Sequence, residues 1–348
     1  MKLLFVGSES SLNIDRVGGI ESTMFELINF LIRKKHDVKI IIIDNVNTNA
    51  VVKKFATIDI SYTQMNSEAV RKEILNNYDA VNFLQTPFEN IFFALYFMFL
   101  KLTRKVYSTK FYFTYDSLNN SNYLQKVKLK LLINRTFVFS KRLEKNVKRI
   151  TNNVTLLTPP VADYYFNIKR LDKSEKEKIL FVGRISKDKG IDVVIEVFKN
   201  LPREKYLINI IGYFNSELDK ITYKKQIENL DLDNLDIKEH STSNTKKEYV
   251  ALNEYDILLL PYQDLGPTLD TPLLVIEGLV SNCKVIVSNI GSLSNISGNL
   301  YFVDNIDCAK DYLDQIEKSS REELKPITYD YSVESFGNQF LETIKKQS

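Results

Sequence analysis

Short apolar runs and helical patterns alternate along the first part of the chain. The run Leu3–Val6 ends in Gly7 and predicts a buried strand, and Val38–Ile43 predicts a second one. Between them, Gly18 and Gly19 precede a segment with the apolar spacing of one helix face. Its apolar residues are Ile20, Met24, Leu27, Ile28 and Leu31. Strand, helix and strand in this order form a βαβ unit, so the pattern predicts a parallel sheet with helices on its faces.

The alternation starts again after Lys169–Lys178, a charged stretch with the composition of an exposed linker. Strands are predicted at Ile179–Val182, Leu207–Ile211, Ile257–Leu260 and Lys284–Val287, and helices at Ile191–Phe198 and Pro272–Val280. We therefore expect an α/β protein with two Rossmann-like, doubly wound parallel-sheet domains. The first covers residues 1–168, the second covers residues 169–330, and residues 331–348 form a C-terminal helix that packs back on the first domain. Ligands bind beyond the carboxyl ends of such strands, so the site is expected in a cleft between the domains.

Composition narrows the class of protein. The chain has 348 residues, 44% hydrophobic and 26% charged, which is typical of a soluble globular protein. It has only two cysteines, Cys283 and Cys308, and two histidines, His36 and His240, which excludes a structural zinc cluster and a disulfide scaffold. The N-terminus enters an apolar strand without the h-region of a signal peptide. These features predict a cytoplasmic protein.

Charge is distributed unevenly. Residues 1–165 hold 23 lysines and arginines against 14 acidic residues, whereas the remainder holds 24 against 30. Within the basic part, residues 101–149 hold 13 basic residues and only two acidic ones, Asp116 and Glu144, directly after the apolar stretch Ile91–Leu102. That stretch is too short to span a bilayer, so it is interpreted either as a buried helix or as part of a membrane-facing patch. The densest basic residues are Lys126, Lys128, Lys130, Arg135, Lys141, Arg142, Lys145, Lys148 and Arg149.

Two loops have the composition of anion-binding sites. Gly18-Gly19-Ile20-Glu21 lies where a loop becomes a helix, so its backbone N–H groups either hold an anion or simply allow a tight turn. It is not the GxGxxG fingerprint of a dinucleotide site. After the strand that ends in Gly183, Arg184 and Lys189 place two cations at a strand's carboxyl end, either to bind a diphosphate or as solvated surface charges.

Taken together, these motifs resemble the retaining glycosyltransferases of family 4, whose GT-B fold has two Rossmann-like domains facing a cleft. The resemblance covers nearly the whole chain. Its first half rests on Gly18–Glu21, His36-Asp37-Val38, Phe137-Val138-Phe139-Ser140 and the segment from Pro159-Pro160-Val161 to Phe166. Its second half rests on Gly183-Arg184 to Lys189-Gly190, and on Glu277 ahead of Lys284-Val285-Ile286-Val287-Ser288.

The resemblance implies a role for individual residues. Arg184 and Lys189 would bind the diphosphate of the donor and act in catalysis, and Glu277 would bind the nucleotide ribose. The remaining donor-binding residues would be Gly18, Gly19, Gly183, Thr271, Leu273 and Leu274. On the acceptor side the corresponding residues would be Glu21, Tyr115 and Asp116.

Two positions depart from the family pattern. The family commonly has a second, sugar-contacting glutamate eight residues before the ribose glutamate, where this chain has Leu269. Either Asp270 or Asp264 could take over that contact, and Asp270 is the catalytic candidate here. A histidine beside the acceptor is replaced by Tyr115, in Phe113-Thr114-Tyr115-Asp116. Donor binding is thus better supported than the identity of the sugar.

The implied reaction needs no cofactor. Sugar transfer requires fixed positive charge at the departing diphosphate, which Arg184 and Lys189 would supply. The helix start near Thr271 could add N–H donors. The only Asp-x-Asp triplet in the sequence, Asp231-Leu232-Asp233, lies in a polar stretch and is interpreted as a solvated turn rather than as a site for Mg²⁺ or Mn²⁺. We therefore expect the metal-independent reaction with retained anomeric configuration that the resemblance implies.

The expected activity is hexosyl transfer from a nucleotide-diphosphate sugar to a glycan or lipid-linked acceptor, in surface glycan, glycolipid or glycoprotein biosynthesis. Two alternatives stay open: a nucleotide-sugar epimerase, and a non-catalytic GT-B partner subunit that lost the sugar-contacting glutamate. The basic patch indicates either peripheral contact with an anionic membrane or an ordinary solvated helix face. Nucleic acid is not expected as a partner, because the second half is acidic and the overall charge is only +3.

Overall fold

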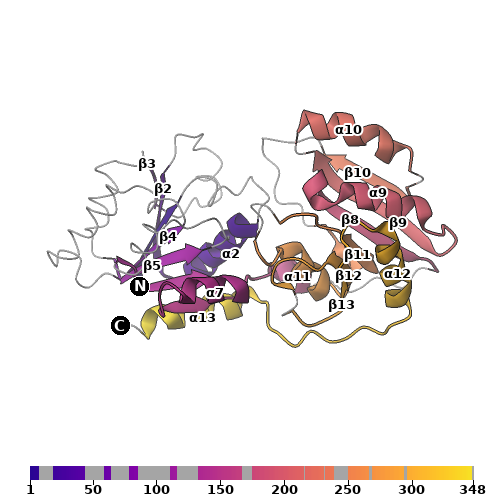
Figure 1. Cartoon of the computed structure of the whole chain (residues 1–348). Coiled ribbons are helices and arrows are strands. Elements are labelled where there is room, and N and C mark those ends of the chain that lie inside the picture. The colour runs from indigo at the N-terminus through magenta and orange to yellow at the C-terminus, as the bar shows by residue number, and fades with distance from the viewer. Residues whose placement is uncertain are drawn as a thin grey trace. The chain divides into compact units, whose positions relative to one another are not determined.

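The chain folds into two compact units. The first consists of Met1–Pro160, Thr268–Asp270 and Tyr331–Ser348, and the second of Val161–Pro267 and Thr271–Asp330 (Figure 1). The computed structural model describes residues 1–7, 19–43, 59–63, 78–84, 110–115, 132–166, 175–214, 216–230, 232–238, 250–265, 269–293 and 296–346. The predicted helix Ile91–Leu102 and the basic residues Lys126, Lys128 and Lys130 lie outside these ranges.

The change from the first unit to the second lies earlier than the predicted linker. It falls at Pro160–Val161, because the short helix α8 (Asp163–Phe166) already packs against α11 (Leu273–Val280) of the second unit. The short segment Thr268–Asp270, which the sequence placed in the second domain, belongs to the first unit. The domain ranges expected from composition therefore differ from the observed units at both places.

A seven-stranded parallel sheet forms the centre of the first unit, with strand order β3-β2-β1-β4-β5-β6-β7. The predicted strands Leu3–Val6 and Val38–Ile43 are its β1 and β2. The strands are β1 (Lys2–Gly7), β2 (Asp37–Ile43), β3 (Asp59–Thr63), β4 (Ala80–Leu84), β5 (Lys110–Tyr115), β6 (Arg135–Val138) and β7 (Val154–Leu156). The central strands β1 and β4 are mostly apolar and buried, as expected where both faces of a parallel sheet are covered.

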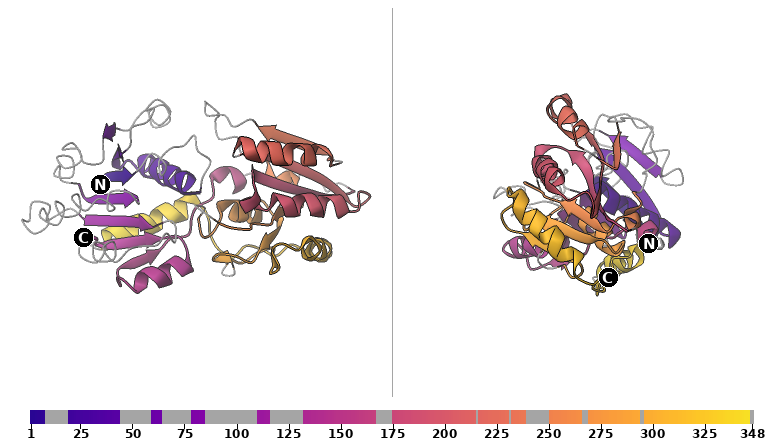
Figure 2. Two further views of the ribbon diagram at one scale, coloured as in Figure 1. Left: turned by 45° about the horizontal axis from the view of Figure 1, so that its top comes forward. Right: turned by 90° about the vertical axis from the view of Figure 1, so that its right-hand side faces the viewer.

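Two helices from opposite ends of the chain lie side by side on this sheet: α2 (Gly19–Arg33) and α13 (Val333–Lys345) (Figure 2). They approach closely at Gly337, where a Cβ atom would lie 2.2 Å from the ring of Phe30. Phe340 of α13 packs against Phe5 and Phe137 of the sheet, with ring centroids 6.2 and 5.0 Å apart. The last helix thus completes the core of the first unit. A third helix, α7 (Lys141–Lys148), begins at Ser140, whose hydroxyl accepts a hydrogen bond from the Leu143 N–H.

The second unit has a six-stranded parallel sheet in the order β10-β9-β8-β11-β12-β13. Its strands are β8 (Glu177–Ile185), β9 (Tyr206–Phe214), β10 (Asn234–Lys238), β11 (Ile257–Leu260), β12 (Lys284–Ser288) and β13 (Leu300–Val303). Its longer helices are α9 (Ile191–Asn200), α10 (Glu217–Glu228), α11 and α12 (Ala309–Ser320), and two 3₁₀ turns are η2 (Lys187–Lys189) and η3 (Leu252–Glu254).

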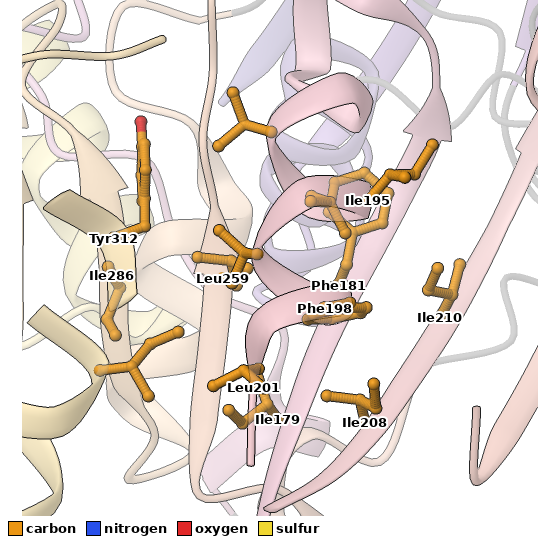
Figure 3. Close-up of a cluster of buried hydrophobic side chains, with 14 of the residues drawn as sticks. Ile179, Phe181, Ile195, Phe198, Leu201, Ile208, Ile210, Leu259, Ile286 and Tyr312 are labelled. Carbon is orange, nitrogen blue, oxygen red and sulfur yellow. The ribbon is translucent and has the colours of Figure 1, made fainter. Parts of the chain in front are cut away.

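The core of the second unit lies between one face of this sheet and the helices α9, α10 and α12. It is built from aliphatic and aromatic side chains such as Phe181 of β8, Phe198 of α9 and Tyr312 of α12 (Figure 3). Leu258 and Val285 point to the other face, where they meet α11 at Gly278. Helices on both faces are the doubly wound arrangement expected from the alternating sequence pattern.

No helix in the described ranges of the chain is long and apolar enough to cross a membrane. In the second unit, the sheet reverses its order between β8 and β11, which are neighbours although β9 and β10 lie between them in sequence. Such a switch point leaves a crevice at the carboxyl ends of the two strands, and this is where open α/β sheets bind ligands. The candidate site is therefore sought there.

Candidate functional site

Two glycines lie side by side near the carboxyl ends of β8 and β9. Gly183 pairs in register with Gly212, and a Cβ on Gly212 would lie 2.5 Å from the Gly183 carbonyl oxygen. Gly183 itself has φ +134° and no atom within 4 Å of where its Cβ would be. The backbone at the end of β8 is thus open to close approach by a ligand.

After β8 the chain makes a single 3₁₀ turn, η2, and enters α9 through Gly190. This residue has φ +77°, and a Cβ there would lie only 1.8 Å from the carbonyl oxygen of Pro261, just after β11. Only glycine meets both requirements. Gly190 therefore lets the turn that contains Lys189 lie directly against the end of β11.

Arg184 and Lys189 are brought together around one carboxylate, that of Asp188. An Arg184 Nη atom donates to Asp188 Oδ2 at 2.9 Å, and Lys189 Nζ lies 3.7 Å from the same oxygen. The other carboxylate oxygen accepts a hydrogen bond from the Ser186 hydroxyl at 2.5 Å. The two predicted cations thus form one cluster at the switch point of the second unit.

Lys189 is unusually buried for a lysine, with 8% of its surface exposed. Burial, together with the positive charge of Arg184, lowers the pKa of Lys189 to about 8, although Asp188 and Asp264 oppose this shift. Both causes disfavour the ammonium form, and a bound anion would favour it. The arrangement is suited to a ligand with two or more negative charges.

The loop after β11 forms the other side of this cluster. The ring of Tyr262 lies beneath the Lys189 ammonium, 4.9 Å from nitrogen to centroid. The next two backbone N–H groups, of Gln263 and Asp264, donate to the Asp188 carbonyl oxygen at 2.9 and 3.2 Å. Asp264 has an exposed side chain, and its charge acts on Lys189. Of the two aspartates considered as sugar contacts, Asp264 is therefore the one at the cation cluster.

Helix α11 brings Glu277 to the same place. Burial and the charge of Glu277 both raise the pKa of Tyr262, while Arg184 lowers it, so Glu277 and Arg184 both lie close enough to act on this tyrosine. Leu274 and Glu277 are partly exposed on one side of α11, whereas Thr271 and Leu273 are buried. Gly278 lies one residue further, and a Cβ there would lie 2.6 Å from a Leu258 methyl group, so the helix packs closely on β11.

Asp270, predicted as a catalytic candidate, has its hydrogen-bond partners in the first unit. It is 3% exposed, belongs to the first unit, and accepts hydrogen bonds there from Ser140 at 2.5 Å and from Arg142. Each of its carboxylate oxygens thus has a protein donor at the start of α7.

The remaining predicted residues belong to the first unit. Gly19 begins α2, and a Cβ there would lie 2.8 Å from a Leu269 methyl carbon. Glu21 lies in the first turn of the same helix, half-buried. Tyr115 is the last residue of β5. Gly18 and Asp116 lie outside the described residues.

Among the residues that the structure describes, no three His, Cys, Asp or Glu side chains are grouped so that they could hold a metal ion.

Sequence reasoning missed two residues of the cluster, Asp188 and Tyr262. Asp188 lies between Arg184 and Lys189 in the motif, but the sequence alone indicates no role for it. Tyr262 follows the predicted strand Ile257–Leu260, and its place at a strand's carboxyl end was the available signal.

Comparison with known proteins supports a common fold. Residues 166–332 match the family model Glycosyl transferases group 1, so this part of the chain is similar to a glycosyltransferase domain. A curated relative, the uncharacterized 41.2 kDa protein in cps region of Klebsiella pneumoniae, is 28% identical over 141 residues. The match covers 37% of this chain and 33% of that protein, so the chain spans about a third of the length of the curated relative it matches.

Solved structures resemble the chain over its whole length. A glycosyltransferase from Rickettsia africae has a TM-score of 0.71 at 18% identity, covering 99% of this chain and 98% of its own. The catalytic domain of Arabidopsis thaliana starch synthase IV, bound to ADP and acarbose, has a TM-score of 0.63 at 11% identity, and the match covers 99% of both chains. An α-glucosyltransferase in complex with UDP-glucose and DNA has a TM-score of 0.63 at 14% identity, and this match also covers 99% of both chains. These likenesses confirm the predicted GT-B fold.

Proposed function

We propose that the chain is a retaining, metal-independent glycosyltransferase of family 4 that transfers a sugar from a nucleotide-diphosphate donor to a glycan or lipid-linked acceptor. The observation that supports it most is the cluster of Arg184 and Lys189 at the switch point of a glycosyltransferase domain. Two fixed cations beside an open glycine backbone suit a diphosphate, and Glu277 lies near enough to act on the same tyrosine as Arg184.

In the proposed mechanism, the protein stabilises the departing nucleoside diphosphate. The bond between the anomeric carbon and the diphosphate oxygen breaks, the acceptor hydroxyl bonds to that carbon on the same face, and its proton leaves to the diphosphate or to solvent. Negative charge grows on the leaving oxygens, where Arg184 and Lys189 would donate. A pKa of about 8 keeps Lys189 mostly protonated at pH 7, ready for this role.

The test is transfer activity with UDP-, GDP- and ADP-sugars, with product analysis and with excess EDTA present. We expect one donor class to yield a new glycoside of unchanged anomeric configuration, with EDTA having little effect. Loss of activity in EDTA that Mg²⁺ or Mn²⁺ restores would contradict metal independence. An epimerised nucleotide sugar would favour an epimerase, and binding without any turnover would favour a non-catalytic subunit.

We propose Asp264 as the carboxylate that contacts the donor sugar. Asp264→Asn is expected to lower kcat ten- to a hundredfold while nucleoside diphosphate binds as before, since the lost charge acts on the sugar. Asp270→Asn should keep kcat and instead lower the stability of the first unit by about 1–2 kcal/mol, because it weakens the bonds to Ser140 and Arg142. Kinetics and thermal unfolding of both variants decide the matter. The reverse result, with kcat lost only in Asp270→Asn, would assign the sugar contact to Asp270.

We also propose that the acceptor is lipid-linked and that the protein contacts an anionic membrane through α7. This helix buries Leu143 and Val147 and exposes Lys141, Lys145 and Lys148, with Arg149 directly after it. Lys148 pairs with Glu144 at 2.7 Å, the only acid of the helix. Each remaining cation contributes about 1 kcal/mol of attraction to an anionic surface. A surface glycan as the product agrees with a relative from a cps region.

Cosedimentation with vesicles tests this contact. The protein should bind vesicles rich in phosphatidylserine at low salt and release them at high salt, and Lys141→Glu/Lys145→Glu should bind several-fold less. The same change at Lys224 and Lys225, exposed on α10, serves as the control. Equal binding to neutral vesicles would contradict the proposal. Binding to DNA instead would indicate a nucleic-acid acceptor, which the shared fold does not exclude, since the α-glucosyltransferase was solved with DNA.

A further inference from the structure

The aromatic ring of Tyr262 faces the ammonium group of Lys189 at the candidate donor site. We propose that Tyr262 is a positioning residue for donor binding, whose ring face holds the Lys189 ammonium toward the diphosphate. This inference rests on the proposed function and deepens it. Tyr262 is not part of the sequence motif that contains Arg184 and Lys189. That motif lies at the end of β8, whereas Tyr262 follows β11.

The geometry that carries the inference is the contact between ammonium and ring. Lys189 Nζ lies 4.9 Å from the centroid of Tyr262, within the 6 Å range of a cation–π interaction. Tyr262 is 5% exposed, so its ring is fixed by packing, and water does not screen the contact well. Such an interaction is stronger when the cation is desolvated, as Lys189 is.

Lys189 needs this support because its carboxylate partner is shared. Asp188 Oδ2 lies 2.9 Å from an Arg184 nitrogen but 3.7 Å from Lys189 Nζ, so the shorter and stronger contact belongs to Arg184. A buried ammonium loses hydration that must be replaced. The electron-rich face of the tyrosine replaces part of it without adding a negative charge that would repel a diphosphate.

The backbone fixes the two partners relative to each other. The Asp188 carbonyl oxygen accepts hydrogen bonds from the N–H groups of Gln263 and Asp264, so the residues that follow Tyr262 are tied to the residue that precedes Lys189. On the other side, Gly190 rests against the carbonyl of Pro261, which precedes Tyr262. The backbone segments that carry the lysine and the ring are thus held together by contacts on both flanks.

The hydroxyl group of Tyr262 has no part in this role. Burial and Glu277 raise its pKa, so the phenol stays neutral throughout the physiological range, and the ring face is what Lys189 meets. Phenylalanine should therefore replace Tyr262 without loss, whereas an aliphatic residue should not. A ribose-binding hydroxyl would give the opposite pattern.

The experiment is a double-mutant cycle on binding of nucleoside diphosphate by calorimetry, using whichever of UDP, GDP or ADP raises the Tm of the wild-type chain. Tyr262→Phe is expected to bind within about twofold of wild type, and Tyr262→Leu about tenfold more weakly. In the Lys189→Ala background, Tyr262→Leu should cause no further loss. Tyr255→Leu, which removes a buried tyrosine at the other end of β11, serves as the control and should bind like wild type.

Two results would overturn the inference: unchanged binding in Tyr262→Leu, or the same tenfold loss with Lys189 already removed. If Tyr262→Leu does not fold, Tyr262→Met replaces it in the cycle, since methionine fills a similar space without a ring. A wild-type chain that binds none of the three nucleotides overturns the proposed donor site and this inference with it. Normal wild-type binding with an unaffected Tyr262→Leu overturns the inference alone.

Discussion

Arg184→Ala is expected to lower kcat/KM by a hundred- to a thousandfold while the second unit stays folded. The side chain is partly exposed and its bonds are to Asp188, so its loss removes little from the core. In the proposed reaction it faces charge that grows on the departing diphosphate. One such charge-assisted contact lowers the barrier by about 3–4 kcal/mol.

Lys189→Ala should have a similar effect, and pH gives it a signature. Burial and Arg184 hold the pKa of Lys189 at about 8, and a bound diphosphate stabilises the charged form. Raising the pH through 8 therefore removes the proton that binding needs, so wild-type affinity for nucleoside diphosphate should fall above pH 8. The phosphates are already ionised there. Lys189→Ala should bind weakly without this pH dependence.

Steady-state kinetics and calorimetry between pH 6.5 and 9.5 measure both effects. The matched control is Lys187→Ala, which removes an exposed cation from the same 3₁₀ turn and should leave activity unchanged. A drop in Tm as large as the drop in activity would mean that the cations stabilise the fold rather than the transition state. Unchanged kcat/KM in Arg184→Ala would refute its assignment to the donor site.

Gly190→Ala is expected to destabilise the second unit by about 3 kcal/mol or more. A left-handed backbone costs an alanine roughly 1–2 kcal/mol, and the new methyl group would lie 1.8 Å from the Pro261 carbonyl oxygen. The clash must be relieved by moving the main chain, which adds about 1–3 kcal/mol. In a unit of this size the Tm should fall by about 10 °C.

Thermal unfolding measures this loss, and Gly183→Ala is the comparison. Gly183 also has a positive φ, but its Cβ would meet no atom within 4 Å, so only the conformational cost applies. The difference between the two variants isolates the close approach to β11. Equal Tm values would mean that the chain relaxes around Gly190 and that the turn is not held against β11.

The sequence was a good guide to elements whose cause is local. β1, β8 and β11 are continuous apolar runs because parallel strands are buried on both faces, and α2 follows its 3.6-residue period. Arg184, Lys189 and Glu277 stand out as candidates from their motifs, and the structure places the three around Tyr262.

Contacts between distant residues could not be predicted in this way. Asp270 is separated by 130 residues from Ser140 and by 128 from Arg142, and no periodicity encodes such a pairing. The change of unit at Pro160–Val161 was also missed, because the charged linker is more conspicuous in sequence than the packing of α8 on α11. Tyr262 belongs to no recognisable motif, and its contact with Lys189 arises only because β8 and β11 are neighbours in the sheet.

The return of α13 to the first unit has a consequence for synthesis on the ribosome. The second unit has every strand of its sheet between residues 177 and 303, so it can fold while the chain is still growing. Phe5, Phe30 and Phe137 are synthesised much earlier and stay uncovered until α13, which packs against them, has been synthesised. During translation the first unit therefore presents uncovered aromatic surface, a typical target of chaperones, until α13 leaves the exit tunnel.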